Sequence, residues 1–201
     1  MKITVLFPTA TEASLFAREE VTTVVSGVGL TATAYATLKA IYQHQPDMLI
    51  LAGVAGVYPH AAHKIGDVVL VESEVEGDLG FQTPDGFVHL AHLPIDMDFE
   101  RRHRLYCPHL PAGYPLASVH SLSANTALSP LVDTRDVAIE NMEGAAFFHV
   151  CLQERQPFLS LRAISNVVQP GHDDWDLAGS VSALTSALHQ LIDRLQSDHT
   201  S

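Results

Sequence analysis

Cysteine is scarce in this sequence. Cys107 and Cys151 are the only two, so at most one disulfide could form, and the small secreted domains that depend on disulfides are excluded. We expect two reduced thiols. The apolar run Ile3–Phe7 is followed by a proline and is too short for the hydrophobic region of a secretory signal. These absences together predict a cytoplasmic protein.

Positive charge and long hydrophobic runs are also lacking. Lys and Arg number 11 against 23 Asp and Glu, a formal net charge of -12, and such a surface repels the phosphate backbone of nucleic acid. The apolar stretch over residues 48–57 is interrupted by glycine and is far shorter than the roughly 20 residues that cross a bilayer. We therefore expect neither nucleic acid nor a membrane as a partner.

The residues that are present have the composition of a compact enzyme-like domain. Apolar residues make up 47% and charged residues 17% of the 201 positions, which is enough to bury a substantial core. We predict a single domain over residues 1–201. Short β-branched runs alternate with longer segments of helical period, which indicates an α/β fold around a largely parallel sheet. The expected strands are residues 3–7, 21–26, 48–52, 68–71, 119–121 and 158–165, and the expected helices are residues 31–44, about 96–106, 141–153 and 177–196.

Two segments between these elements are predicted to be irregular. Residues 53–56 read Gly-Val-Ala-Gly, and the glycines favour a tight turn that a ligand can approach closely. Residues 77–115 are rich in Pro, Gly, His and charge. We expect this second segment to be a loop-rich excursion from the domain.

Candidate functional residues follow the ends of the predicted strands. Glu12 comes after the first strand, residues 27–29 after the second and residues 53–56 after the third, while Glu143 begins a helix and Asn166 ends a late strand. The carboxyl ends of parallel strands gather at one edge of a sheet, where ligands bind. We expect these residues to share one site.

Three segments carry a resemblance to a known family. They read Pro-Thr-Ala-Thr-Glu-Ala at residues 8–13, Asn-Met-Glu-Gly-Ala-Ala at residues 141–146 and Arg-Ala-Ile-Ser-Asn at residues 162–166. In this order they resemble the purine nucleosidase and phosphorylase superfamily and, within it, the futalosine hydrolases of menaquinone biosynthesis. The resemblance implies a nucleoside phosphorylase-like three-layer fold, with a central mixed, largely parallel twisted sheet flanked by helices. It also implies no cofactor, no metal and a homodimer, to whose interface residues 77–115 are expected to contribute.

The reaction that the resemblance implies is hydrolysis of an N-glycosidic bond. Because positive charge develops on the ribose, the site must activate a water, tolerate that charge and stabilise the departing base. By resemblance, Glu12 is the catalytic base that deprotonates the water, Glu143 holds the ribose hydroxyls and Met142 packs on the sugar. Arg162 has a supporting catalytic role beside the water. The residues alone leave alternatives: a capping or surface role for Glu12, compensation of a helix dipole by Glu143, and a structural ion pair for Arg162.

Asn166 indicates which base is released. Adenine-releasing relatives have Asp at the matching position, whereas this sequence has Asn. An amide offers both donors and an acceptor, so it can donate to a 6-oxo group while its carbonyl accepts the proton on N7. The better match is hypoxanthine or guanine. Because Asn is not a general acid, we expect the proton of the leaving base to arrive through water. The residue alone also allows an Asn that merely ends a strand.

The remaining expectations concern the rest of the pocket. Gly53 and Val54 are expected to contact the substrate, with Val54 standing where adenine-releasing nucleosidases have Ser. Trp175 is expected to cover the base or the aromatic tail of the substrate, although ordinary helix packing is an alternative. The helical spacing of His60 and His63 lacks nearby carboxylate or cysteine ligands, so no metal site is predicted.

The favoured function is hydrolysis of futalosine to hypoxanthine and dehypoxanthine futalosine, with a small-molecule nucleoside as the partner. Phosphate as the nucleophile would need arginines around it, and the sequence offers few candidates. Two alternatives stay open. One is another enzyme of the same fold, either a methylthioadenosine/S-adenosylhomocysteine nucleosidase or a purine nucleoside phosphorylase, and the other is a non-catalytic nucleotide-binding module.

Overall fold

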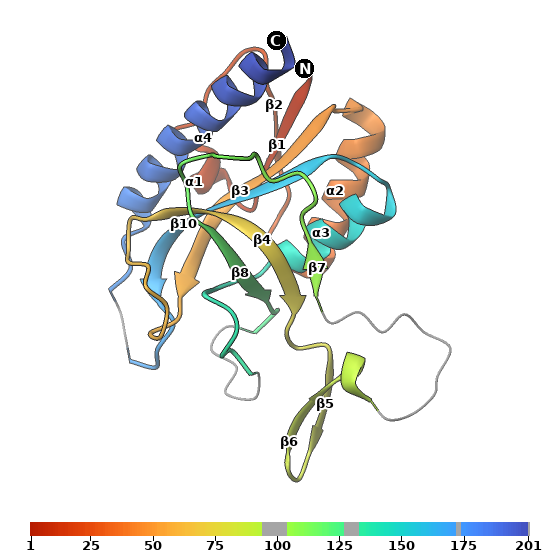
Figure 1. The fold of residues 1–201 in the computed structure, drawn as a ribbon, viewed down its shortest axis with the longest axis vertical. Helices are drawn as coiled ribbons and strands as arrows, with labels where there is room; N and C mark the ends of the chain where they lie inside the picture. The colour runs from red at the N-terminus through yellow and green to blue at the C-terminus, as the bar shows by residue number, and fades with distance from the viewer. Residues whose placement is uncertain (94–103, 127–132, 172–173, 201) are drawn as a thin grey trace.

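The computed structural model describes residues 1–93, 104–126, 133–171 and 174–200. The two termini lie close together at the top of Figure 1. In chain order the elements are β1 (Ile3–Phe7), α1 (Ala10–Ala13), β2 (Thr22–Val25), α2 (Leu30–His44), β3 (Met48–Val57), β4 (Val68–Glu76), β5 (Gly80–Thr83), β6 (Gly86–His89), the 3-10 helix η1 (Leu90–His92), β7 (Leu105–Tyr106), β8 (Ser118–Ser123), β9 (Ile139–Asn141), α3 (Gly144–Gln153), β10 (Phe158–Val167) and α4 (Leu177–Thr200).

The central sheet is mixed and curls back on itself. Its strand order is β10-β4-β8-β9-β3-β1-β2, with β7 paired to β4. Strand β10 pairs with β4 on one side and with β3 on the other, so five strands form a closed ring from which β1 and β2 extend. The parallel pairings are those of β1 with β2 and with β3, of β10 with β3, and of β8 with β4 and with β9. The predicted fold class, a mixed and largely parallel sheet flanked by helices, is confirmed.

Helices cover the sheet from two sides (Figure 1). Helices α2 and α3 pack against each other, while α4 packs against β10 and β3. Among the described residues, the core contains four fully buried phenylalanines, of which Phe148 and Phe158 have ring centroids 4.8 Å apart in an edge-to-face arrangement. Every residue of β10 except the last is buried, so the candidate site residues of this strand, Arg162 and Asn166, are fixed in a packed wall.

Several predicted boundaries are wrong, and the reasons are physical. Residues 53–56 do not form a turn but continue β3, because glycines are tolerated in a strand where neighbouring side chains approach the backbone closely. Asn141 ends β9, and the helix starts only at Gly144. Leu105 and Tyr106 form β7 rather than the end of a helix. The rest of that predicted helix lies almost entirely outside the described residues.

The described part of the predicted excursion over residues 77–115 is not a continuous loop. It contains the two-stranded hairpin β5–β6, which projects away from the body of the domain at the bottom of Figure 1. Gly86 at the turn has a φ of 131°, a conformation that residues with a side chain rarely adopt. Gly86 is therefore a hairpin signal in the sequence, but the composition of the segment alone does not distinguish a hairpin from a loop.

Candidate active site

One pocket of about 450 Å³ opens where β1, β3 and β10 end and α3 begins. It collects most of the predicted site from segments far apart in the sequence. Glu12, Val54, Met142, Glu143, Asn166 and Trp175 all line it. Gly53 and Arg162 are not among the lining residues, and the side chain of Arg162 is completely buried. The three groups assigned to water, sugar and base therefore face one cavity, with Arg162 behind its wall.

Glu12 is held rigidly at the start of the short helix α1. Its backbone N–H donates to the Thr9 hydroxyl at 3.2 Å, which is the N-cap contact of this helix. The same hydroxyl donates to Glu12 Oε2 at 2.6 Å, and the backbone N–H of Val54 donates to Oε1 at 2.9 Å. Glu12 is buried, with 4% of the surface of the residue exposed. Two donors thus fix its orientation while it stays at the pocket surface, which is the arrangement that a general base requires.

Glu143 is the N-cap residue of α3 and forms a buried ion pair with Arg162. Arg162 Nη1 lies 3.2 Å from Glu143 Oε2, with side chains 0% and 6% exposed. Arg162 Nη1 also donates to the carbonyl of Val54 at 3.2 Å. The backbone N–H of Gly29 donates to Glu143 Oε1 at 3.3 Å. The carboxylate therefore borders the pocket with its charge balanced from behind, where it can favour positive charge on a bound sugar.

Asn141 organises the groups beneath the pocket. Its Oδ1 accepts from the backbone N–H groups of Glu143 at 2.8 Å and Gly144 at 2.7 Å, and from Arg162 Nη2 at 3.1 Å. Its Nδ2 donates to Glu74 Oε1 at 2.8 Å. Asn141 thus ties the ion pair to the start of α3, and its place in the resembling segment is the signal that could have revealed it.

Glu74 is a completely buried carboxyl that the sequence analysis did not single out. Besides Asn141, the Ser123 hydroxyl donates to its Oε2 at 2.8 Å. Burial raises the pKa of Glu74 to about 7, and the positive charge of Arg162 opposes this rise in pKa. A side chain at Gly144 would collide with Glu74, which explains the glycine at the start of α3. Strand β4 extends five residues beyond its predicted end, and this extension brings Glu74 under the site.

Gly53 leaves room for the side chains of Arg162 and Glu12 rather than forming a turn. A Cβ atom at this position would lie 2.6 Å from Arg162 Nη1 and 3.0 Å from Glu12 Oε1. Both distances are shorter than ordinary van der Waals contacts, so a larger residue would displace these side chains. The sequence predicted that a ligand would approach this glycine closely. In the structure, the side chains of Arg162 and Glu12 approach it closely.

Asn166 lies near the end of β10, on the wall of the same pocket. Asn166 is buried, with 8% of its surface exposed. The Ser165 hydroxyl donates to Asn166 Oδ1 at 3.0 Å, and Asn166 Nδ2 donates to the carbonyl of Val167 at a long 3.4 Å. The register of β10 against β3 shifts between Ile164 and Asn166. Asn166 follows this irregularity and lines the pocket, where a base can meet its amide.

Trp175 also lines the pocket, but its side chain is largely solvent-exposed at 61%. Sequence reasoning missed other lining residues, among them Thr9, Val28 and Glu140. Thr9 and Val28 lie inside segments that carried or supported the resemblance. Glu140 had no signal of its own because its position depends on how β9 pairs with β3.

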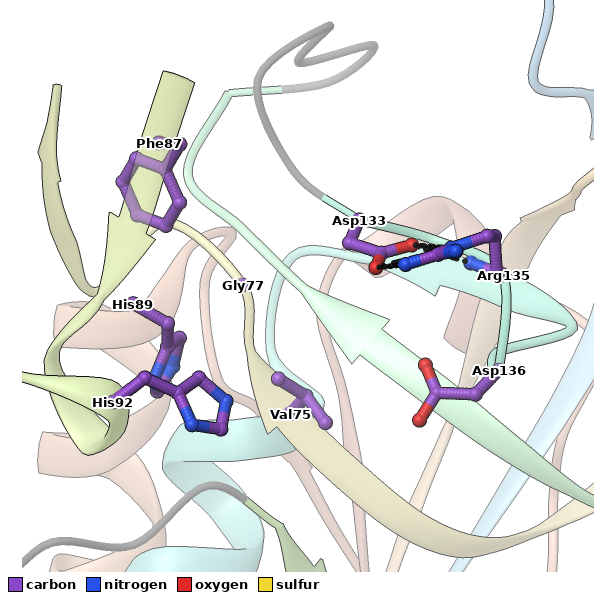
Figure 2. A pocket seen from close by; sticks show the side chains of 8 residues that line it. All are labelled: Val75, Gly77, Phe87, His89, His92, Asp133, Arg135 and Asp136. Carbon is purple, nitrogen blue, oxygen red and sulfur yellow. Dashed lines mark hydrogen bonds and ion pairs between the residues drawn. The ribbon is translucent and has the colours of Figure 1, made fainter. Parts of the chain in front are cut away.

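A second pocket, of about 550 Å³, lies beside the β5–β6 hairpin. In Figure 2, His89 and His92 line one wall and Asp133, Arg135 and Asp136 the opposite wall. Arg135 pairs with Asp133 at 2.6 Å, and both side chains are exposed. Within the described residues, no group of three or more His, Cys, Asp or Glu side chains is placed to hold a metal.

The sequence as a whole matches the model of the phosphorylase superfamily over residues 9–197. The chain belongs to this superfamily. Among individual superfamily members, futalosine hydrolase of Thermus thermophilus is 31% identical over 183 residues, which cover 83% of this chain and 79% of that protein. The 5'-methylthioadenosine/S-adenosylhomocysteine nucleosidase of Colwellia psychrerythraea is 29% identical over 166 residues, covering 74% of this chain and 67% of that protein.

Solved structures of the phosphorylase superfamily share the fold. The native structure of futalosine hydrolase from Helicobacter pylori superimposes with a TM-score of 0.77 over 96% of this chain and 98% of that one, at 20% identity. Among the described residues, no helix is both long and apolar enough to cross a bilayer.

Proposed function

We propose that this phosphorylase-superfamily protein is a nucleosidase that hydrolyses a 6-oxopurine nucleoside, with futalosine as its substrate and hypoxanthine as the released base. The observation that carries the proposal is the convergence of Glu12, Glu143 and Asn166 on one pocket. The similarity to futalosine hydrolases supports the choice of substrate. Each of the three groups matches one requirement of the reaction.

Glu12 activates the attacking water. Its carboxylate is oriented by Thr9 and Val54, so it can accept a proton from a water in the pocket without reorganising. Glu143 holds the ribose hydroxyls, and Arg162 fixes the Glu143 carboxylate from behind. Met142 and Val54 border the sugar, and Trp175 closes the pocket over the substrate. Positive charge that develops on the ribose meets acidic groups in a partly dehydrated site, which lowers the barrier.

Water is a better nucleophile here than phosphate. No Lys or Arg occurs among the described residues that line the pocket, whereas Glu12, Glu140 and Glu143 do. An incoming phosphate would be repelled by these carboxylates and would lack the bidentate partners that arginine provides. Hydrolysis is therefore favoured over phosphorolysis.

Asn166 holds the departing base. Its Nδ2 donates to O6 and its Oδ1 accepts from the protonated N7, while Ser165 donates to Oδ1 and restrains the amide. An adenine would present a 6-amino donor to the same Nδ2 group. Leaving buried donors unpaired costs about 1–3 kcal/mol each, so the amide favours a 6-oxopurine.

A methylthioadenosine/S-adenosylhomocysteine nucleosidase is the second candidate, because a member of that class is 29% identical to this chain. The deciding experiment measures release of base from futalosine, methylthioadenosine and inosine, with and without phosphate. The proposal expects hypoxanthine from futalosine, no dependence on phosphate and little adenine. Preferential release of adenine contradicts the assignment of Asn166, and formation of ribose 1-phosphate products contradicts the assignment of water as the nucleophile.

The protein is further proposed to be a single cytoplasmic domain that works as a homodimer in menaquinone biosynthesis. The pathway follows from futalosine as the substrate. The segment from residue 77 to 115 supports the interface, since its hairpin projects from the domain and carries Phe81 with 44% of its surface exposed. Light scattering of the wild type and of Phe81→Asp tests this arrangement: the wild type is expected to have twice the chain mass, and the variant to be monomeric.

A further inference from the structure

Glu140 is a third carboxylate of the pocket, and the mechanism above gives it no task. It lies on β9, one residue before Asn141, and its side chain lines the same cavity as Asn166. It is a partly buried residue. Its distance in sequence from Glu12 and Asn166 hides this relation, which arises only when the strands pair.

The pairing of three strands places Glu140 opposite Asn166. Gly56 of β3 is paired with Glu140 of β9 on one side and with Asn166 of β10 on the other. Neighbouring strands are about 4.8 Å apart, so two side chains separated by one strand can flank a flat ring. Gly56 lies between them, and a Cβ there would collide with Val168 Cγ2 and would come within 3.2 Å of Asn166 Nδ2. The missing side chain lets Val168 pack directly on the β3 backbone, and Glu140, Asn166 and Val168 line the same pocket.

Tyr58 holds the Glu140 carboxylate in place. The Tyr58 hydroxyl donates to Glu140 Oε2 at 2.7 Å. Tyr58 is buried and stacks on His60, with ring centroids 5.7 Å apart and an interplanar angle of 10°. A carboxylate that is restrained by a buried donor and borders a ligand pocket is suited to read one specific hydrogen atom.

We propose that Glu140 is a specificity-determining residue that accepts a hydrogen bond from the N1–H group of the 6-oxopurine. This inference rests on the proposed function, in which Asn166 binds the O6 and N7 edge of that base. In a 6-oxopurine N1 carries a hydrogen, whereas in adenine N1 is an acceptor. An ionised carboxylate only accepts, so Glu140 attracts the first base and repels the lone pair of the second.

The two residues together recognise a continuous polar edge. Asn166 contacts O6 and N7 at one end of this edge, and Glu140 contacts N1–H at the other. Both contacts select for the 6-oxo form, since one reads the exocyclic oxygen and the other reads the ring hydrogen that accompanies it. Guanine has the same N1–H and O6 pattern, so Glu140 separates 6-oxopurines from adenine and does not separate hypoxanthine from guanine.

The test measures dissociation constants of hypoxanthine, 1-methylhypoxanthine and adenine by calorimetry, for the wild type, Glu140→Gln and Glu140→Ala. A glutamine keeps the shape of the side chain and can donate to N1 of adenine as well as accept from N1–H. We expect Glu140→Gln to reduce the preference for hypoxanthine over adenine by about 10- to 100-fold. In Glu140→Ala, hypoxanthine and 1-methylhypoxanthine are expected to bind with similar affinity, whereas the wild type rejects the methylated base.

Glu154→Gln is the matched control. Glu154 also accepts from a tyrosine, with the Tyr42 hydroxyl 2.9 Å from its Oε2, but the pair is exposed and lies outside the pocket. This variant should keep the wild-type ratio of base affinities. If the Glu140 variants also keep that ratio while the wild type prefers hypoxanthine, the role of Glu140 is wrong and the proposed function stands. A wild type that prefers adenine overturns the proposed function itself.

Discussion

An arginine–carboxylate pair lies at each of the two pockets described above, behind the wall of the candidate active site and on the wall of the hairpin pocket, and the two pairs differ in their surroundings. In the candidate active site, the side chains of Arg162 and Glu143 are 0% and 6% exposed. In the pocket beside the hairpin, those of Arg135 and Asp133 are 89% and 59% exposed (Figure 2). The first pair is further tied to Asn141, whereas the second joins residues only two positions apart in the sequence.

This difference determines what each pair can do. An exposed pair is screened by water and is worth less than about 1 kcal/mol. Removing one partner of a buried pair leaves an uncompensated charge and costs about 3–5 kcal/mol. Rigid, desolvated charges can stabilise a transition state, while mobile and solvated charges cannot do so to the same degree. Charged residues alone do not distinguish the two pockets, because both have them. The candidate active site differs because its charged pair is buried and is hydrogen-bonded to Asn141.

The largest effect is expected from Glu12→Gln. The amide keeps the size of the side chain but cannot accept a proton from water, so kcat for release of base should fall by about 10²–10⁴-fold. Binding of hypoxanthine, measured by calorimetry, should change little. A variant that keeps the wild-type kcat would show that another group activates the water.

The next effect is on stability and comes from Arg162→Met. Methionine fills part of the same volume but leaves the Glu143 carboxylate buried without its cation, so the free energy of unfolding should fall by about 3–5 kcal/mol. Urea denaturation measures this loss. A loss below about 1 kcal/mol would mean that solvent reaches Glu143, and the contrast between the two pockets would disappear.

Glu74 should produce a pH-dependent difference in stability. Its pKa in the folded protein is raised from 4.5 to about 7 by burial, so between these values the folded state binds more protons than the unfolded state. The free energy of unfolding of the wild type therefore falls as the pH rises through this window, by about 3 kcal/mol relative to Glu74→Gln. Denaturation curves of both proteins, recorded at pH values from about 4 to about 8, measure the difference in the free energy of unfolding. A constant difference contradicts the raised pKa.

The smallest effect is expected from Arg135→Met in the hairpin pocket. Its partner Asp133 remains solvated after the substitution, so the free energy of unfolding should change by less than about 0.5 kcal/mol and kcat should stay at the wild-type value. The same two assays that are applied to Arg162→Met measure this outcome. A large loss of activity in Arg135→Met would assign the hairpin pocket a part in catalysis.

The sequence predicted well what depends on local pattern. The first strand is found over the predicted residues, and Glu12 and Asn166 line one pocket because the carboxyl ends of parallel strands lie at one edge of the sheet. Residues whose role depends on the pairing of distant strands were not predicted. Glu74 reaches the site through the extension of β4, and Glu140 reaches it through the register of β9 against β3. The strand through residues 53–56 was mistaken for a turn because Gly53 accommodates Arg162 and Glu12 while Gly56 accommodates Val168 and Asn166, and no local pattern reveals these contacts.

A crystal structure with bound hypoxanthine tests the central claim most directly. The account predicts that the base lies between Asn166 and Glu140, with O6 and N7 facing the amide and with N9, the atom that carries the sugar in the nucleoside, directed toward Glu12 and Glu143. Hypoxanthine seated in the hairpin pocket, or in the candidate active site with its O6 edge turned away from Asn166, would contradict it.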